Sequence, residues 1–378
     1  MSKKISLITL QYVNNYGSIL QTFASQTYLE NKGYKVEIVN YVRENYRFNN
    51  LKKNMKEYYQ QKGIIFKLPF VSDILTKRWE YIYMKRNFIF DKFRKDKIKF
   101  SREYFSAEEL LDNPPIADFY CVGSDQVWNY LYNDGVLPEY FLNYAPFGKK
   151  KFSFASSFGV EQIEDKEKEK LIKEYLQTFS LITVRENSAI KILEKINIKG
   201  KYQILDPTLL LNKEQWMEKL SLHNTKKEKY LLLYQLNPCQ EMNEFAKQIS
   251  REKGLKLVII SNNIRMSISE AEIIENPEVE EFLNLILYSE VVITDSFHGT
   301  AFSLNFNKEF FSWMPSKYST RLMSVLDLVG LRDRAFKEND IRWKNMKKID
   351  YQIVNKILID SRKNAEKLIM EVLSPNEK

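Results

Sequence analysis

Short apolar runs that alternate with stretches of helical periodicity constrain the fold of this chain more than any other feature. Residues 5–10 and 35–41 have the pattern of strands, and between them apolar side chains recur at helical spacing until Gly33. A strand, a helix and a second strand within about forty residues form a βαβ unit, whose strands are parallel. In such sheets ligands bind at the carboxyl ends of the strands, so we look for function in the turns that follow them.

The alternation continues along the chain and then starts again, which predicts two lobes. A chain of 378 residues also exceeds what one hydrophobic core usually supports. We therefore expect an α/β protein of two Rossmann-like, doubly wound lobes over residues 1–212 and 213–345, with a C-terminal helix within 346–378 that packs back on the first lobe. The expected strands are 119–123, 151–156, 181–185, 230–236, 255–261, 291–294 and 309–313, and the expected helices are 166–178, 240–253, 278–289 and 351–373.

Residues 45–105 interrupt this rhythm, and we interpret them as a basic, mostly helical insertion in the first lobe. Between Arg47 and Arg102 sixteen Lys and Arg face five Asp and Glu, whereas the whole chain carries a net charge of +9. All of the excess positive charge therefore lies in this stretch. It predicts an acidic partner such as phosphate-bearing lipid, an anionic membrane surface or nucleic acid, and the alternative is a solvated helical face in a lysine-rich chain.

Several classes of protein are disfavoured by what the sequence lacks. Its apolar runs fall short of the roughly 20 residues needed to cross a bilayer, and its start does not resemble a signal peptide, so we expect a cytoplasmic protein. Two cysteines and two histidines are too few for the common metal sites, so we predict no metal and no resident cofactor. Serine hydrolases, P-loop ATPases and dinucleotide oxidoreductases are disfavoured because their glycine-rich motifs are absent.

The sharpest motif runs from Val291 to Phe302, where a strand leads through a turn of small residues into a helix. Free backbone N–H groups at such a helix start bind phosphate or carboxylate. His298 in this turn can act as an acid, as a base or as a donor to a phosphate oxygen. The alternative is a structural histidine hydrogen-bonded at the helix start.

Polar groups gather in two further turns. Residues 122–129 combine Asp125, Gln126, Asn129 and Trp128, which suits hydrogen bonds to sugar hydroxyls and stacking of the indole on a sugar ring. The alternative is a helix cap with a tryptophan in the core. The turn over residues 14–18 has the same character but is less specific.

Two arginines complete the candidate site. Arg185 ends an apolar strand, where its charge must face a cleft or a partner, and Glu186 could be that partner. Arg321 opens an amphipathic segment, and a salt-bridge role is the alternative for it. Asp206, in an Asp-Pro-Thr turn, is interpreted as structural.

These motifs together, in this order along the chain, resemble the polysaccharide pyruvyl transferase family. The segments that carry the resemblance are 14–21, 123–129, 154–159, 184–186, 205–208 and 294–299, and the similarity extends over about residues 5–335. The resemblance implies a two-lobed GT-B fold and transfer of a pyruvyl group from phosphoenolpyruvate to a sugar of a cell-surface polysaccharide, with formation of a ketal. It implies phosphoenolpyruvate as co-substrate and a sugar or lipid-linked glycan as acceptor.

The resemblance also implies roles for individual residues. Arg185 and His298 fall on positions where the family binds the donor, and Asp125 would be the base or an acceptor ligand. Better characterised members carry an arginine two residues before the histidine, where this chain has Ser296, and Arg321 or Lys317 would supply the missing charge. The remaining candidates are Gly299 and Thr300 on the donor side, and Asn15, Gln126 and Trp128 on the acceptor side.

Two other functions stay open at this stage. A GT-B glycosyltransferase that uses a nucleotide sugar would need the same kind of cleft, and a non-catalytic glycan-assembly protein could keep the fold without the donor site. Nucleic acid ranks lowest among the partners, and we expect none, because no nucleic-acid-binding module accompanies the basic stretch. With a lipid-linked acceptor, the insertion would face the inner surface of the plasma membrane. The sequence leaves open the acceptor sugar, the ketal linkage and the oligomeric state.

Overall fold

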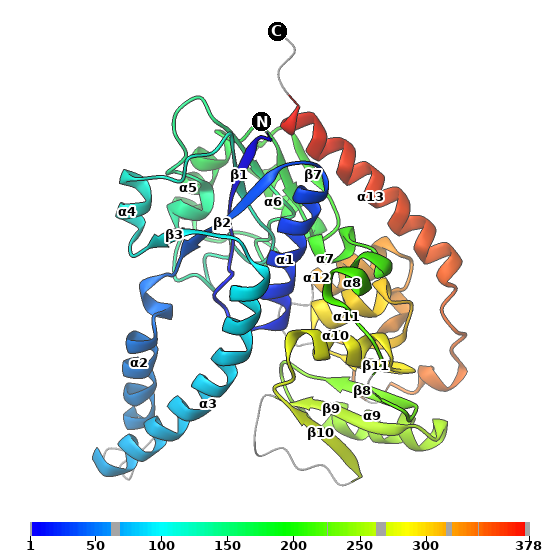
Figure 1. Ribbon diagram of the computed structural model, residues 1–378. Coiled ribbons are helices and arrows are strands. Elements are labelled where there is room, and N and C mark those ends of the chain that lie inside the picture. The colour runs from blue at the N-terminus through cyan, green and yellow to red at the C-terminus, as the bar shows by residue number, and fades with distance from the viewer. Residues whose placement is uncertain are drawn as a thin grey trace.

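Two parallel β-sheets, one in each lobe, form the framework of the protein (Figure 1). The computed structural model describes residues 2–61, 69–224, 226–261, 270–314, 320–338 and 340–374. Helices cover the sheets, and the two lobes meet along helices at their centre (Figure 1). The predicted α/β fold with two Rossmann-like lobes is therefore confirmed.

The first lobe contains a sheet in the order β3-β2-β1-β4-β5 with only parallel neighbours. Bridges from Phe152 to Leu181 and from Ser156 to Val184 connect β5 to the pair β6-β7. The strands are β1 (Lys4–Ile8), β2 (Lys35–Tyr41), β3 (Phe100–Tyr104), β4 (Phe119–Val122), β5 (Lys150–Ser153), β6 (Ile182–Val184) and β7 (Lys201–Gln203). The helices around them are α1 (Tyr16–Asn31), α4 (Ala107–Asp112), α5 (Lys166–Leu176), α6 (Asn187–Lys195), α7 (Pro207–Leu210) and α8 (Lys213–Leu220).

The second lobe contains a parallel sheet in the order β10-β9-β8-β11-β12-β13. The chain fills one half of this sheet from β8 to β10 and the other half from β11 to β13, which is the doubly wound order. Where the direction reverses, a crevice opens at the carboxyl ends of β8 and β11. The strands are β8 (Tyr230–Tyr234), β9 (Lys256–Ser261), β10 (Ala271–Glu275), β11 (Val291–Thr294), β12 (Glu309–Trp313) and β13 (Ala335–Phe336). The helices are α9 (Gln240–Lys253), α10 (Val279–Leu287), α11 (Phe297–Asn305), α12 (Thr320–Leu328) and α13 (Tyr351–Leu373).

The predicted insertion needs one correction. Helices α2 (Phe48–Gln61) and α3 (Pro69–Lys97) form an arm that projects from the first lobe (Figure 1). Residues 100–104, however, are not part of a helical insertion but form β3, the edge strand of the sheet. An edge strand is partly solvated, so its sequence lacks the continuous apolar run that marks a central strand. Residues 62–68 of the insertion lie outside the described residues.

The two lobes share hydrophobic contacts beneath the crevice. The ring of Tyr16, at the start of α1, stacks on Phe282 of α10 with 4.2 Å between ring centroids, and its hydroxyl donates to the Pro277 carbonyl. Helix α13 returns to the first lobe, where Lys150 Nζ donates to the Val372 carbonyl at 3.1 Å. Among the described residues, no helix is long and apolar enough to span a membrane.

Candidate functional site

A cavity of about 210 Å³ lies between the lobes, where the carboxyl ends of β1, β4, β8 and β11 meet. This is the position at which doubly wound sheets bind ligands. Both lobes contribute polar side chains to it. The first lobe supplies Asn15, Ser18, Asp125, Gln126 and Tyr132, and the second supplies Asn237, Asp295, Ser296, His298 and Arg321.

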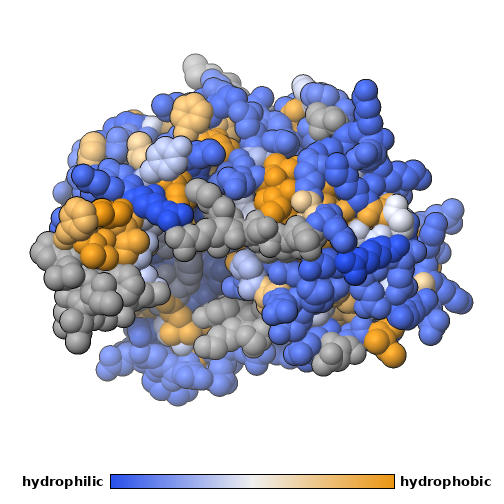
Figure 2. All heavy atoms as spheres, turned by 90° about the horizontal axis from the view of Figure 1, so that it is seen from below, coloured by the Kyte–Doolittle hydropathy of each residue, from blue (hydrophilic) through white to orange (hydrophobic). Residues whose placement is uncertain are grey.

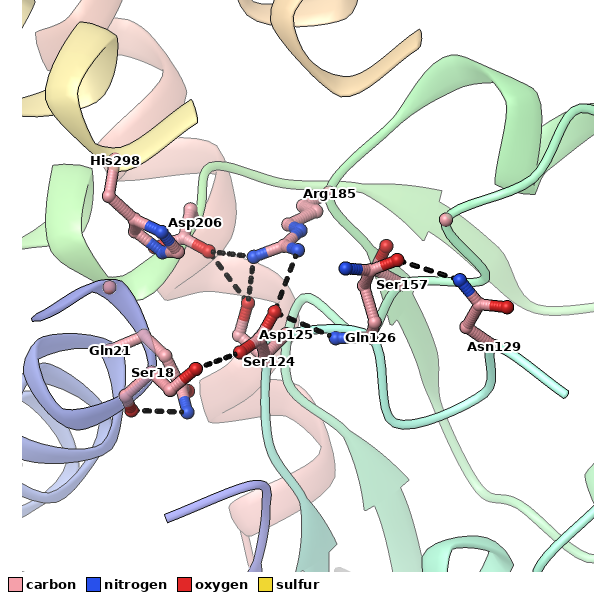
Figure 3. Close-up of polar contacts among 12 residues, drawn as sticks. Ser18, Gln21, Ser124, Asp125, Gln126, Asn129, Ser157, Arg185, Asp206 and His298 are labelled. Carbon is pink, nitrogen blue, oxygen red and sulfur yellow. Dashed lines mark hydrogen bonds and ion pairs between the residues drawn. The ribbon is translucent and has the colours of Figure 1, made fainter. Parts of the chain in front are cut away.

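Arg185 occupies the centre of the first-lobe wall but not its surface (Figure 3). Its side chain is 0% exposed, with Nη1 donating to Asp206 Oδ2 at 2.9 Å and Nη2 to Asp125 Oδ1 at 3.3 Å. Glu186 lies 3.6 Å from Nε, and the guanidinium carbon is 4.8 Å from the centre of the Phe297 ring. Three carboxylates therefore surround this cation, and Arg185 is not among the residues that line the cavity. The sequence had suggested that Arg185 contacts the donor directly.

Asp125 lies at the end of β4 and reaches the cavity. The Ser18 hydroxyl donates a hydrogen bond to Asp125 Oδ2 at 2.6 Å, and Asp125 Oδ1 accepts a hydrogen bond from Arg185. Burial opposes ionisation, but Arg185 and His298 together with the Ser18 hydroxyl hold the pKa of Asp125 below its usual value. The backbone φ of Asp125 is 73°, a left-handed conformation that is unfavourable for residues other than glycine. Such conformations are typical of functional sites.

Asp206 caps α7, as the structural turn suggested by the sequence requires, and it also approaches the second lobe. Its Oδ1 accepts from the Thr208 backbone and hydroxyl, while Oδ2 accepts from Ser124 at 2.7 Å and from Arg185. Despite burial, the charges of His298 and Arg185 and these hydroxyls hold the pKa of Asp206 at about 2. Oδ1 also lies 3.9 Å from His298 Nε2 across the lobe boundary. Asp206 is thus ionised at neutral pH and faces the candidate catalytic histidine.

His298, in the first turn of α11, lies between the lobes. Its Nε2 is buried and has no hydrogen-bond partner among the described residues. Burial lowers the pKa of His298 to about 4, although Asp206 acts in the opposite direction. A Cβ atom on Gly17 would lie 2.0 Å from His298 Nδ1, so a glycine is required there. The imidazole is therefore neutral at pH 7 and is packed against the start of α1.

The start of α11 is only partly available to a ligand. Ser296 is the N-cap, and its hydroxyl accepts from the Gly299 backbone at 3.2 Å. Thr300 is fully buried, its hydroxyl pairs with Ser312 of β12, and its backbone N–H donates to the Ser296 carbonyl. The structure thus places Ser296 in the wall of the cavity. The hydrogen-bonding groups of Gly299 and Thr300, which were predicted to bind the donor substrate, are instead used within the helix and against the sheet.

Arg321, on the first turn of α12, lines the cavity and is half-buried. Its Nε is buried without a hydrogen-bond partner among the described residues. Burial and the charge of Arg185 lower the pKa of Arg321. Among the described residues, no carboxylate lies within ion-pair distance of its guanidinium. One turn further along, Ser324 accepts from Asn187 and Gln203 of the first lobe and so fixes α12. Lys317, the other substitute for the missing arginine, lies outside the described residues.

The predicted acceptor side is only partly present in the cavity. Trp128 is 2% exposed, its indole donates to the Tyr140 carbonyl at 2.9 Å, and Phe141 and Phe158 cover its rings. This corrects its predicted role, because neither face is free to stack on a sugar. Gln126 does line the cavity, and Asn129 donates to its side chain. Asn15 also lines it, but its side chain caps α1 by accepting from Gly17.

Sequence reasoning missed the full role of four residues of this site. Two of them, Ser18 and Tyr132, were not singled out, and two were named for part of their role only: Asp206 as a structural turn and Glu186 as the partner of Arg185, from which it lies 3.6 Å away. Glu186 Oε1 accepts from Ser157, Phe158 and Gly159, which explains why the 154–159 and 184–186 segments belong together. The signal for Asp206 was its place after a strand, because the strands of a parallel sheet bring their carboxyl ends to one edge.

Comparisons with known proteins identify a family and a fold. The sequence profile of the polysaccharide pyruvyl transferase family matches residues 15–317. A UDP-GlcNAc 2-epimerase from Methanocaldococcus jannaschii, solved with UDP-GlcNAc and UDP, is similar with a TM-score of 0.52 and 14% identity over 99% of each chain. A second UDP-N-acetylglucosamine 2-epimerase is similar with a TM-score of 0.52 and 12% identity over 98% of this chain and 95% of its own. No curated protein matches the sequence. At these identities the structures show a common fold.

Proposed function

Because the chain belongs to the polysaccharide pyruvyl transferase family, a family of transferases, we propose that its donor is phosphoenolpyruvate. The acceptor is a sugar of a cell-surface polysaccharide or of its lipid-linked precursor, and the products are a pyruvate ketal and phosphate. The proposal needs no resident cofactor, so activity should survive treatment with EDTA. The proposal also includes peripheral contact of the protein with the inner face of the plasma membrane.

One observation carries the proposal: the second-lobe wall presents two nitrogens without hydrogen-bond partners beside an ionised carboxylate of the first lobe. Arg321 Nε and His298 Nε2 are buried and unpaired among the described residues. Unpaired buried polar groups are costly, and an anion that accepts from Arg321 and from a protonated His298 removes the cost. Phosphoenolpyruvate carries a phosphate and a carboxylate, so it can engage Arg321 with one group and His298 with the other.

The reaction sets the demands on the site. The methylene carbon of the donor gains a proton and becomes a methyl group, while a sugar hydroxyl oxygen bonds to the neighbouring carbon and releases its proton. A second hydroxyl of the same sugar then replaces the phosphate, which leaves with the proton of that hydroxyl. Two C–O bonds form, one C–O bond to phosphate breaks, and no oxidant is needed.

We assign the proton transfers to His298 and Asp125. Binding of the phosphate places negative charge beside His298, which raises the pKa of the imidazole from about 4 and lets it take up a proton for the methylene carbon. Asp125 is ionised and receives the hydroxyl proton, and the Ser18 hydroxyl fixes the orientation of this carboxylate. Arg321 compensates charge that develops on the leaving phosphate.

Thermal unfolding with and without phosphoenolpyruvate tests the donor assignment. We expect the midpoint of the wild type to rise by several degrees at saturating ligand and the rise to vanish in Arg321→Met. Arg332→Met removes an exposed arginine elsewhere in the second lobe and should keep the full shift. A wild-type shift that persists undiminished in Arg321→Met would contradict the assignment of this residue.

A nucleotide-sugar glycosyltransferase is the alternative, because a similar fold in the M. jannaschii epimerase holds UDP-GlcNAc and UDP. The same experiment separates the two functions. Stabilisation by UDP-sugars but not by phosphoenolpyruvate would favour the alternative. A glycan-assembly protein without catalysis predicts no phosphate release with any acceptor and an intact cellular phenotype in His298→Ala.

A further inference from the structure

The outer face of α3 carries a stripe of exposed apolar side chains that no part of the described protein covers. Phe70 is 75% exposed, and Tyr81 and Phe88 are each 69% exposed. Ile74 and Met84, about half exposed, complete the stripe. At about 100° per residue these five positions fall within an arc of about 80°, so they share one face of the helix over roughly 27 Å.

Basic residues interleave with this stripe. Lys77 lies within the same arc, and Arg78 and Lys85 flank it, all three exposed. None of the three pairs with a carboxylate among the described residues. The acidic residues of α3 as far as residue 95 are all engaged: Asp73 pairs with Lys56, Glu80 with Lys52 and Asp91 with Arg94. The outer face therefore presents unneutralised positive charge together with apolar surface.

The arm stands clear of the body of the protein. In Figure 1, α2 and α3 project away from the first sheet alongside the second lobe, and Figure 2 shows apolar side chains beside hydrophilic ones towards the tip of the arm. Stripes of this size are rarely left exposed in soluble proteins without a partner.

The root of the arm is fixed to the candidate site. Arg86 donates to the Asn14 carbonyl at 2.6 Å, Arg94 donates to Asn14 Oδ1 at 2.9 Å, and Asn14 donates to Asn87. Asn15, the next residue, lines the cavity. Helix α3 therefore connects the stripe directly to the rim of the cleft.

We infer that the outer face of α3 is a docking surface for an anionic lipid bilayer. Apolar side chains enter the boundary between headgroups and acyl chains, and Lys77, Arg78 and Lys85 contact lipid phosphates. A second copy of the chain does not fit, because two such stripes would bring like charges together. Nucleic acid would use the charges but leave the aliphatic side chains exposed. The inference deepens the proposed function, because a docked arm holds the cleft where a lipid-linked acceptor resides.

Sedimentation with lipid vesicles tests this surface. The full chain should pellet with vesicles of phosphatidylglycerol and phosphatidylcholine in equal parts but not with phosphatidylcholine alone. Binding should weaken at about 1 M salt, where charges are screened within about 3 Å. Lys77→Glu with Lys85→Glu should weaken binding by at least roughly tenfold, and Tyr81→Ser with Phe88→Ser by a similar factor.

Helix α13 supplies matched controls, because it is also long and carries exposed residues of the same kinds. Lys356→Glu with Lys363→Glu makes the same change in net charge, and Ile353→Ser with Ile359→Ser removes exposed apolar side chains. Both controls should bind vesicles as the wild type does. Thermal unfolding midpoints equal to that of the wild type would show that all four variants are folded.

Three results would overturn the inference: no sedimentation of the wild type with anionic vesicles, equal losses in the α3 and α13 variants, or displacement from vesicles by an RNA oligonucleotide that binds more tightly. Transfer to a water-soluble acceptor separates this inference from the proposed function. The α3 variants should retain it. Vesicle binding without any transfer would remove the proposed function alone, and transfer without vesicle binding would remove the docking surface alone.

Discussion

The two walls of the cleft use their charged groups in different ways. On the first-lobe wall Arg185 is surrounded by Asp125, Asp206 and Glu186, and serine hydroxyls donate to each of these carboxylates. On the second-lobe wall Arg321 and His298 have buried nitrogens without partners among the described residues. The first wall therefore neutralises its own cation, although Arg185 Nε and Glu186 Oε2 also lack hydrogen bonds, whereas Arg321 has no ion pair among the described residues. Substitutions on the first wall should act mainly on stability, and substitutions on the second mainly on binding.

Arg185→Met should have the largest effect on stability. It leaves three buried carboxylates without their cation, a loss that costs about 3–5 kcal/mol of unfolding free energy. Arg321→Met removes a cation that has no close partner and should cost less than about 1 kcal/mol. Urea unfolding of both variants at pH 7 measures the difference. Equal losses would mean that the two walls do not differ in this respect.

The pH dependence of stability tests the neutral state of His298. Its pKa is about 4 in the folded protein and about 6.5 unfolded, so the unfolded chain binds more protons between these values and stability falls as the pH is lowered through this window. Between pH 7 and pH 4.5 the loss is about 2–3 kcal/mol. We expect His298→Gln to remove this part of the loss in urea unfolding at the two pH values. A similar loss in the variant would assign it to other groups.

Gly17→Ala tests how closely the two walls approach. The added methyl group would lie 2.0 Å from His298 Nδ1, so the imidazole must move, at a cost of about 1–3 kcal/mol. The same substitution in a His298→Ala background should cost much less, because the ring that it meets is gone. A double-mutant cycle by urea unfolding measures this coupling. Additive effects would show that Gly17 and His298 do not press on one another.

Trp128→Phe should have a modest effect on stability and none on acceptor binding. The variant keeps most of the aromatic packing and loses the hydrogen bond to the Tyr140 carbonyl, which costs about 1 kcal/mol. Because the indole lies in the core, KM for the acceptor should not change. An increase in acceptor KM without a loss of stability would mean that Trp128 contacts the acceptor after all.

The accuracy of the sequence predictions follows the strength of the local pattern. Buried strands and amphipathic helices were predicted with the observed bounds at β2, β11, β12, α9 and α13. The edge strands β3, β10 and β13 were missed, because a strand with a solvated side does not need an apolar run. The motif turns were found, but which side chains face the cavity was not. Trp128 and Thr300 point inwards, and no local pattern distinguishes that from pointing into the cleft.

Asp206 and Ser18 show what a single sequence cannot supply. Each resembles an ordinary turn or helix residue, and each acquires its role from a partner more than 80 positions away, Ser124 and Asp125 respectively. A charge network of this kind depends on the relative placement of strand ends, which is a property of the whole sheet. The basic charge of the insertion was visible in the sequence, whereas its concentration on one face of α3 required the helix register and the pairing of its acids with α2.

The stacking of Tyr16 on Phe282 has a consequence for the motion of the lobes. A hinge that opened the cleft widely would separate these rings and the shared core around them, and would expose apolar surface from both lobes. We therefore expect the two lobes to lose structure together, in a single cooperative transition by calorimetry. Substrates would then enter through local rearrangements at the rim of the cleft, and the spacing of the reacting groups would be set when the chain folds.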